Sequence, residues 1–175
     1  MSPYAETKVL GENIAKNLSN QTTKITCLRF FNVYGPGQPY SSAYASAIPI
    51  FIEKLYRKKP ITIFGNGEQT RDFIHVNDVC NAISNSFKYD IPNYSIYNLG
   101  TGESISINDL IQLLREIFTD FDLETEEPIY SSPRKGDILH SVADKSTIAP
   151  FYFPNEKTRI SLGLRDLVSR TISKN

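Results

Sequence analysis

The alternation of helix-like and strand-like segments constrains the fold of this chain more than any other feature. Residues 4–18 have the spacing of an amphipathic helix, and residues 25–31 follow as a mostly apolar run typical of a buried strand. Further helical patterns occupy residues 48–56, 78–87, 107–117 and 162–172, and strand-like runs occupy residues 61–64, 71–76 and 95–99. Such alternation predicts an α/β fold.

Glycine, proline and small polar residues divide these segments. Residues 33–42 are rich in Gly and Pro and are predicted to be a loop, while residues 65–67 and 100–102 are predicted turns. Ser2, before Pro3, is the expected cap of the first helix, and either Ser106 or Asn108 is expected to cap the helix at 107–117. The polar stretch 122–135 is expected to be a loop with a short strand.

Composition excludes several classes of protein. Lys+Arg and Asp+Glu are equal at 19 each among 175 residues, so no charge excess points to nucleic acid or an anionic membrane. The sequence has no signal peptide and no apolar run near 18 residues, which favours a soluble cytoplasmic protein. No Cys/His cluster indicates a metal, and Cys27 and Cys80 are expected to be reduced, buried thiols.

Tyr4 and Lys8 are one helical turn apart, so they share a face of the first predicted helix. An ammonium near the Tyr4 hydroxyl favours the phenolate and lowers the phenol pKa, which prepares a tyrosine for general acid–base catalysis. On this pair alone, two solvated residues on a helix face would be the better interpretation. Other segments, in a fixed order, decide between the two.

The chain carries a series of motifs that together resemble one family. They are Tyr4-Ala5-Glu6-Thr7-Lys8, Leu28-Arg29-Phe30-Phe31-Asn32-Val33-Tyr34-Gly35-Pro36, Gly67-Glu68-Gln69-Thr70-Arg71-Asp72-Phe73-Ile74-His75-Val76, Tyr97-Asn98-Leu99-Gly100-Thr101-Gly102 and Pro133-Arg134-Lys135-Gly136-Asp137. This ordered set resembles the extended short-chain dehydrogenase/reductase family, and within it the NAD-dependent nucleotide-sugar epimerases. The resemblance covers nearly the whole chain, but only the second half of such an enzyme.

The resemblance implies the C-terminal part of a Rossmann-type NAD(P)-binding fold with its smaller α/β substrate-binding domain. Residues 1–45 are then a remnant of the nucleotide-binding domain, and residues 46–175 form the substrate domain, with about 71–100 packing back on the first. The family's glycine fingerprint for the dinucleotide is absent, because no Gly-x-Gly here has a third glycine at the required offset. We therefore expect a missing N-terminal half, from a longer gene or in trans.

For catalysis the resemblance implies NAD as the cofactor. Tyr4 would take the proton from a sugar hydroxyl, while Lys8 would bind the nicotinamide ribose and hold down the tyrosine pKa. Phe30 is expected beside the cofactor. His75 lies in an apolar run, where a structural histidine is the usual case, and His140 has no matching metal partners.

For the substrate the resemblance implies a UDP-sugar held by its diphosphate. Arg71 and Arg134 would grip the diphosphate, and Asn32 would donate its amide to it. Asp137, a loop carboxylate with no need of a partner, would accept hydrogen bonds from the nucleoside ribose. The alternatives are an asparagine that satisfies a turn after a strand and arginines in ordinary surface ion pairs.

Two further positions bear on which ligand fits. Thr62 and Phe64 match the strand against which the uracil ring packs, although an aromatic in such a strand is often plain core. Ser141 matches the position beside the C2 group of the sugar, where a small residue leaves room for an N-acetyl group. This favours UDP-N-acetylhexosamines over plain hexoses; the alternative is an exposed serine near the helix cap Asp144.

Two functions are expected on this basis. The first is half of a nucleotide-sugar 4-epimerase, which oxidises C4 by hydride transfer to NAD and reduces it from the opposite face; a dehydratase or decarboxylase of the same family is the alternative chemistry. The second is a non-catalytic truncated protein or interaction module. Because the helix with Tyr4 normally packs on the absent half and on a homodimer partner, we also expect exposed apolar surface and self-association.

Overall fold

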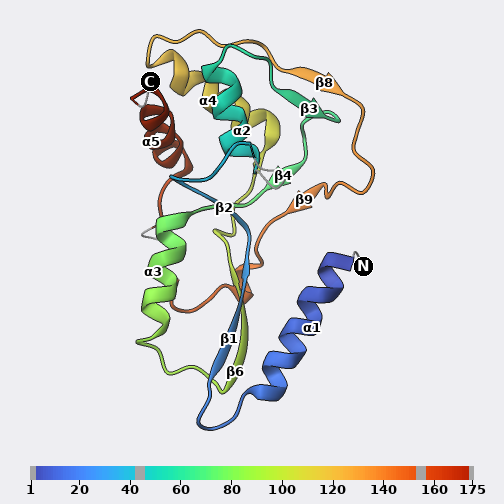
Figure 1. Ribbon diagram of the computed structural model, residues 1–175, viewed down its shortest axis with the longest axis vertical. Coiled ribbons are helices and arrows are strands. Elements are labelled where there is room, and N and C mark those ends of the chain that lie inside the picture. Colours follow the sequence, from blue (N-terminus) through green and yellow to red (C-terminus); the bar gives the residue numbers. More distant parts are fainter. Residues whose placement is uncertain (1–2, 42–45, 153–156, 174–175) are drawn as a thin grey trace.

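The computed structural model describes residues 3–41, 46–152 and 157–173 and confirms an α/β fold (Figure 1). The α-helices are α1 (Pro3–Leu18), α2 (Ala47–Tyr56), α3 (Val76–Ser86), α4 (Ile107–Thr119) and α5 (Ile160–Ile172), with a 3-10 turn at η1 (Lys145–Thr147). The molecule is elongated, with α2, α4 and α5 at one end and α1 and α3 at the other. The predicted cap Ser2 lies outside the described residues.

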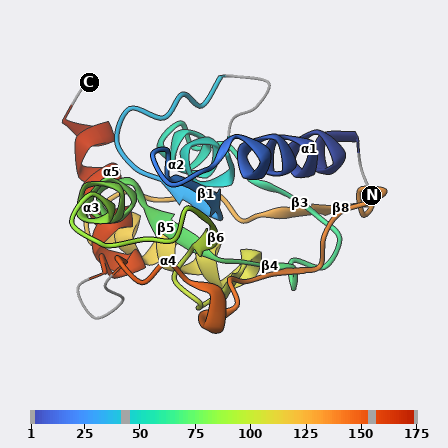
Figure 2. The ribbon, with the colours of Figure 1, turned by 90° about the horizontal axis from the view of Figure 1, so that it is seen from below.

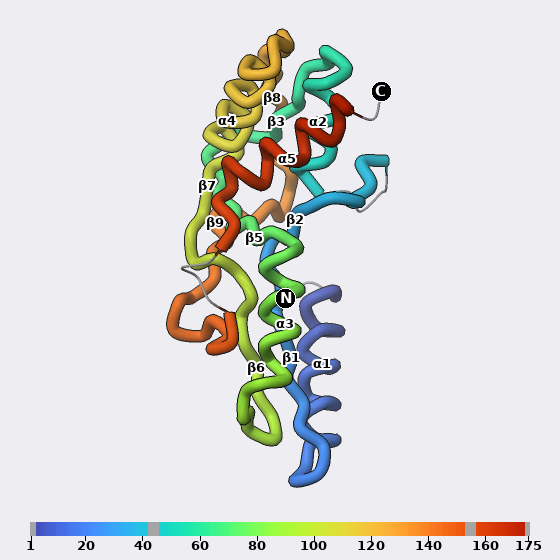
Figure 3. The backbone as a smooth tube through the Cα atoms, turned by 90° about the vertical axis from the view of Figure 1, so that its left-hand side faces the viewer, coloured from blue at the N-terminus to red at the C-terminus, as the bar shows by residue number. Residues whose placement is uncertain are grey.

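Short, mostly parallel strands connect the two ends. The pairs are β1 (Ile25–Phe30) with β6 (Tyr94–Leu99), β2 (Asn32–Tyr34) with β5 (Phe73–His75), and β3 (Thr62–Phe64) with β8 (Ile129–Ser131), all parallel. In the three-stranded sheet, β4 (Thr70–Arg71) lies between antiparallel β7 (Ile105–Ser106) and parallel β9 (His140–Ser141). Figure 3 shows that the chain passes between the two ends of the molecule more than once. Residues far apart in sequence therefore meet where the ends join.

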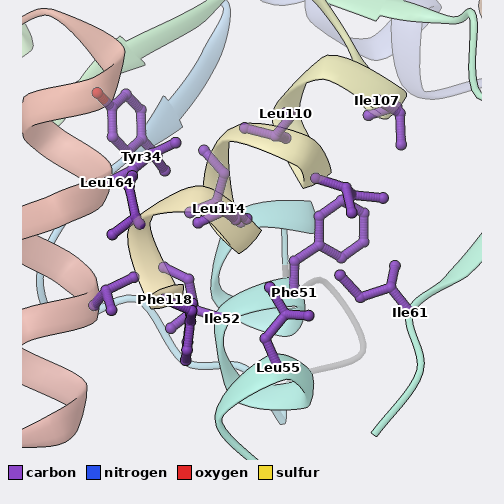
Figure 4. Close-up of a cluster of buried hydrophobic side chains, with 14 of the residues drawn as sticks. Tyr34, Phe51, Ile52, Leu55, Ile61, Ile107, Leu110, Leu114, Phe118 and Leu164 are labelled. Atoms are coloured by element: carbon purple, nitrogen blue, oxygen red, sulfur yellow. The ribbon is translucent and has the colours of Figure 1, made fainter. Parts of the chain in front are cut away.

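One hydrophobic core lies between α2, α4 and α5 (Figure 4). The stripe predicted for α4 is buried, and its members are Ile107, Leu110, Ile111, Leu114 and Ile117. Each such side chain contributes about 1.5–3 kcal/mol when fully buried. Of the two proposed caps, Ser106 is the one observed, because its Oγ accepts a hydrogen bond from the Asp109 amide at 3.0 Å.

A second core lies against β1 and β6, which are seen between α3 and α1 in Figures 1 and 2. Ile74, Val79 and Leu99 are buried there, with α3 covering one side. On the other side, α1 has no buried residue. Polar contacts attach it instead, since Arg29 on β1 donates two hydrogen bonds of 2.7 Å to the Glu12 carboxylate.

Asp72 holds together the segments at the join, the region where the two ends of the molecule meet. Its wholly buried carboxylate accepts hydrogen bonds from the amides of Thr101, Gly102 and Ala143 and from the Thr101 hydroxyl, at 2.6–3.1 Å. Its carbonyl oxygen accepts from the Asn32 amide at 3.0 Å. Because Asp72 stands between β4 and β5, these bonds hold the backbone beside Arg71 in one position.

Three details differ from the sequence-based expectation. Residues 33–34 belong to β2 rather than to the predicted loop, because their backbone pairs with β5. Val76 begins α3 instead of ending a strand, since the His75 Nδ1 accepts from the Asn77 amide and caps the helix. Cys80 is exposed and Cys27 only half-buried, so the prediction of two buried thiols was wrong.

The turn at 65–67 is explained by Gly67. Its φ is +79°, a conformation that L side chains rarely adopt, and a Cβ there would overlap the side chain of Asn108. Within the described ranges, no helix is long and apolar enough to cross a membrane.

Candidate functional site

A cavity of about 530 Å³ opens between α2, β3 and the loop after β8. Its lining brings together six predicted site residues from separate motifs: Asn32, Thr62, Phe64, Arg71, Arg134 and Asp137. The other four predicted residues do not line it; they are Tyr4, Lys8, Phe30 and Ser141. The fold therefore assembles six of the seven residues matched to the substrate, while Ser141 and the residues matched to the cofactor lie elsewhere.

Arg71 and Asp137 form an ion pair in this cavity. The Arg71 Nη2 donates to Asp137 Oδ1 at 2.7 Å, and its Nη1 donates to the Thr70 carbonyl at 2.9 Å. The expectation of an Asp137 carboxylate without a partner was therefore wrong. The pair orients the guanidinium, and it offsets part of the charge that an anionic ligand would meet.

Arg134 lies over the ring of Phe64, with its guanidinium carbon 3.8 Å from the ring centroid. Phe64 is half-buried and alternates along β3 with the buried Ile63, so its ring faces away from the core side. Within the described part of the chain, no ion pair engages Arg134. Its donors are therefore available to an anion.

Asn32 makes a structural contact and also lines the cavity. Its Nδ2 donates to the Asp72 carbonyl at 3.0 Å, which satisfies the backbone where β2 meets β4 and β5. That bond uses one of the two Nδ2 hydrogens and leaves the other hydrogen and Oδ1. Asn32 therefore braces the backbone of Asp72 rather than a local turn, and it still presents one donor to the cavity.

Ser46, Lys54 and Gln69 also line the cavity but were not identified from the sequence. Ser46 is the N-cap residue of α2, yet its side chain makes no cap hydrogen bond, and its buried Oγ has no partner among the described residues. The start of a helix favours negative charge. Ser46 could have been identified from the sequence, because a serine directly before a helical pattern predicts an N-cap.

The residues matched to the cofactor lie on α1 and at the end of β1. Lys8 Nζ is 5.2 Å from the centroid of the Tyr4 ring, and the two residues share one exposed helix face. Tyr4 is 71% exposed and Phe30 is 53% exposed. In Figure 1 the N-terminal end of α1 is the end nearer to β9. All three side chains are exposed, and the sequence lacks the glycine loop that would hold the pyrophosphate of a dinucleotide.

Ser141 lies in β9 directly opposite Arg71 in the parallel register. Its carbonyl accepts from the Asp72 amide at 2.9 Å, and the residue is half-buried. His140 Nδ1 lies 3.1 Å from the Thr70 hydroxyl, on the same strand pair. No group of three or more His, Cys, Asp or Glu residues suited to a metal occurs in the ranges that the structure describes.

Comparison with known proteins identifies the family. The model of the NAD dependent epimerase/dehydratase family matches residues 1–100, and the chain belongs to this family. Its fold is the C-terminal part of the Rossmann-type extended short-chain dehydrogenase fold. A putative UDP-glucose 4-epimerase of Methanocaldococcus jannaschii is 36% identical over 146 residues, which make up 82% of this chain and 45% of the relative.

Two solved structures are similar over 99% of this chain. The UDP-N-acetylglucosamine 4-epimerase of Methanobrevibacter ruminantium, in complex with UDP-N-acetylmuramic acid, has a TM-score of 0.84 at 33% identity. The UDP-glucose 4-epimerase of Thermotoga maritima, with UDP-glucose, has a TM-score of 0.83 at 32% identity. The chain spans 55% and 54% of these two proteins, about half the length of each.

Proposed function

We propose that this chain is the substrate-binding half of an NAD-dependent nucleotide-sugar 4-epimerase. The observation that carries the proposal is the cavity that Arg71, Arg134 and Asn32, from three separate motifs, line together with Ser46, the N-cap residue of α2. Two guanidinium groups, an amide and a helix start are the donors that a diphosphate needs. Both solved relatives named above contain a UDP-sugar, which supports the same ligand class here.

In the proposed complex the six predicted residues that line the cavity divide the ligand among them. Arg71 and Arg134 hold the diphosphate, and Asn32 donates its remaining amide hydrogen to it. Asp137 keeps Arg71 oriented and accepts from the ribose through its second carboxylate oxygen. The base packs along Thr62 and Phe64.

We also propose that Ser141, as a small side chain opposite Arg71, leaves room for an N-acetyl group on the sugar. A Ser141→Tyr variant is expected to reduce affinity for UDP-N-acetylglucosamine more than affinity for UDP-glucose. Calorimetric titration of the two ligands measures both affinities. An equal loss of affinity for both would contradict the proposed role of Ser141.

For the chemistry we assign proton transfer at the sugar hydroxyl to Tyr4, with Lys8 beside it on α1. NAD, when bound, would supply the hydride-transfer chemistry at the sugar carbon. Because this sequence has no glycine loop for the dinucleotide, we expect residues 1–175 alone to bind substrate without turnover. The division into residues 1–45 and 46–175, with 71–100 packing back, is part of the same proposal.

Isothermal titration of UDP-N-acetylglucosamine into the purified chain tests the proposal. Arg71→Ala should weaken binding at least about tenfold, a change of roughly 1.4 kcal/mol. Arg170→Ala is the matched control, because Arg170 pairs with Asp166 on the surface of α5 and does not line this cavity. Equal binding by the wild type and Arg71→Ala, or no binding by the wild type, would contradict the proposal.

A further inference from the structure

Lys54 is the cation in the cavity lining that the proposed function leaves unused. It lies on the same face of α2 as Ile50 and Phe51 and is only partly exposed. Its Nζ donates to the Pro60 carbonyl at 3.3 Å, and no ion pair engages it within the described residues. The neighbouring Glu53 pairs with Arg57 instead. A half-buried lysine without a carboxylate retains two ammonium hydrogens for another acceptor.

The position of Lys54 separates it from the proposed diphosphate site. Ser46, at the start of α2, is eight residues away, which corresponds to about 12 Å along a helix. Pro60, to which Lys54 donates, comes two residues before β3 begins at Thr62. The ammonium therefore lies near the start of β3, whereas Arg134 lies over Phe64, the last residue of that strand.

The wall between these two ends suits a flat ring. Thr62 and Phe64 are half-buried and lie on the side of β3 opposite the buried side chain of Ile63, although all three residues line the cavity. The Arg134 guanidinium lies over one face of the Phe64 ring, so a base would pack against Thr62 and the rest of the Phe64 side chain. In the proposed complex, a nucleotide with its phosphates at Arg71 extends its base along this strand. The atoms at the far edge of the base then face Lys54.

We propose, on the basis of the proposed function, that Lys54 selects the nucleobase by donating a hydrogen bond to the exocyclic carbonyl oxygen at position 4 of uracil or thymine. A charged donor makes a strong hydrogen bond to such an oxygen. Cytosine presents an amino group at the same position, so that two donors would face each other. A site built to donate rejects a ligand that lacks the acceptor, because its own donor is left unpaired.

Lys54 could instead only brace residues 57–60 through the Pro60 carbonyl. The two roles differ in what they change. Loss of a brace would alter the shape of the cavity for every nucleotide and lower the stability of the chain, so the affinities for UDP and CDP would change together. Loss of a base-selecting lysine would change the ratio of the two affinities.

The test is calorimetric titration of UDP and of CDP into the wild type, Lys54→Met and Lys59→Met. Methionine keeps the apolar length of the side chain, and Lys59 is an exposed residue after α2 that does not line the cavity. We expect the wild type to bind UDP about tenfold more tightly than CDP, a preference of the size that one charge-assisted hydrogen bond supplies. Lys54→Met should bring the two affinities to within about twofold, with Lys59→Met unchanged.

An unchanged UDP-to-CDP ratio in Lys54→Met, with its thermal midpoint preserved, would overturn the inference. A parallel loss of both affinities would overturn it too, and would assign Lys54 to the brace. If, with either of these outcomes, the wild type binds UDP and Arg71→Ala does not, the proposed function stands without the inference about Lys54. If UDP fails to bind the wild type, both fall.

Discussion

At the scale of single residues, Asp72 and Tyr34 show two different fates of a buried polar group. The Asp72 carboxylate accepts four hydrogen bonds from three residues, so its burial is compensated. The Tyr34 hydroxyl is buried and has no hydrogen-bond partner among the described residues. Burial, and then the nearby Asp78 carboxylate, raise the pKa of Tyr34, which keeps the phenol neutral. The first side chain organises the join between the two ends of the molecule, and the second only fills space.

Asp72→Asn should therefore destabilise the chain by about 2–3 kcal/mol, because an amide cannot replace a carboxylate that accepts at both oxygens. Urea unfolding followed by circular dichroism measures the change. Asp166→Asn, which removes an exposed carboxylate on α5, should stay within about 0.5 kcal/mol of the wild type. An unchanged urea midpoint for Asp72→Asn would show that this carboxylate does not hold the join.

Tyr34→Phe should leave the free energy of unfolding unchanged or raise it by up to about 1 kcal/mol, since it removes a buried hydroxyl that has no partner among the residues the structure describes. The same urea measurement applies. A loss of 2 kcal/mol or more, roughly the cost of breaking a buried hydrogen bond, would mean that the hydroxyl has a partner after all.

At the scale of elements, α1 is held to β1 by polar contacts rather than by a buried face. The side-chain hydrogen bond from Arg29 lowers the pKa of Glu12, although partial burial opposes the shift. A carboxylate with a lowered pKa contributes stability that is present above its unfolded pKa and is lost as the pH falls through the folded value. The attachment of α1 should therefore weaken as the pH falls below about 4.3, the ordinary range for glutamate.

Glu12→Gln should remove this acid sensitivity. Because Arg29 is more than half exposed, the variant should lose no more than about 1 kcal/mol at pH 7. Hydrogen exchange of the α1 amides at pH 7 and at low pH measures the attachment directly, after correction for intrinsic exchange rates. If wild-type and variant α1 amides respond identically to acid, the ion pair does not control the attachment.

The sequence predicted most elements but not how some of them pair. The periodic stripe of α4 was sufficient to predict its buried face, because local spacing determines which side chains lie together. The apolar run of β1 predicted the strand, but the expectation of a buried strand was wrong, because none of its residues is buried and Arg29 and Phe30 are exposed. Residues 33–34 were assigned to a loop because their glycine- and proline-rich neighbours hide a strand that forms only against β5. The Arg71–Asp137 ion pair joins residues 66 positions apart, and no local pattern encodes such a contact.

The candidate site was predictable to a similar extent. Motif resemblance identified the six residues that line the cavity together, whereas Lys54 belongs to no motif and becomes visible only when α2 is placed against β3. The roles of these residues stay predictions. Tyr4, Lys8 and Phe30 face solvent in this chain, so the geometry in which they would act depends on whatever covers α1 and β1.

At the scale of the whole molecule, α1 presents a continuous apolar stripe. Leu10, Ile14 and Leu18 are 60%, 59% and 62% exposed and lie four residues apart on one face. In addition, β1 pairs only with β6 within the described ranges, although parallel sheets are usually covered and extended. These surfaces are expected to associate in water.

We predict that the weight-average molar mass of the chain, measured by sedimentation, rises with protein concentration. A Leu10→Glu, Ile14→Glu double variant should shift this rise to higher concentrations, because it places charge on the stripe. Analytical ultracentrifugation measures both. A clean monomer for the wild type at all concentrations would refute the prediction.

The most direct test of the central claim is to locate the bound ligand. Two-dimensional NMR of the ¹⁵N-labelled chain, titrated with UDP-N-acetylglucosamine, reports which amides and arginine side chains change. The account predicts shifts confined to the cavity around Asn32, Arg71 and Arg134, along β3 and at the start of α2. Shifts centred instead on the groove between residues 35–40 and α5, or an unchanged spectrum, would contradict it.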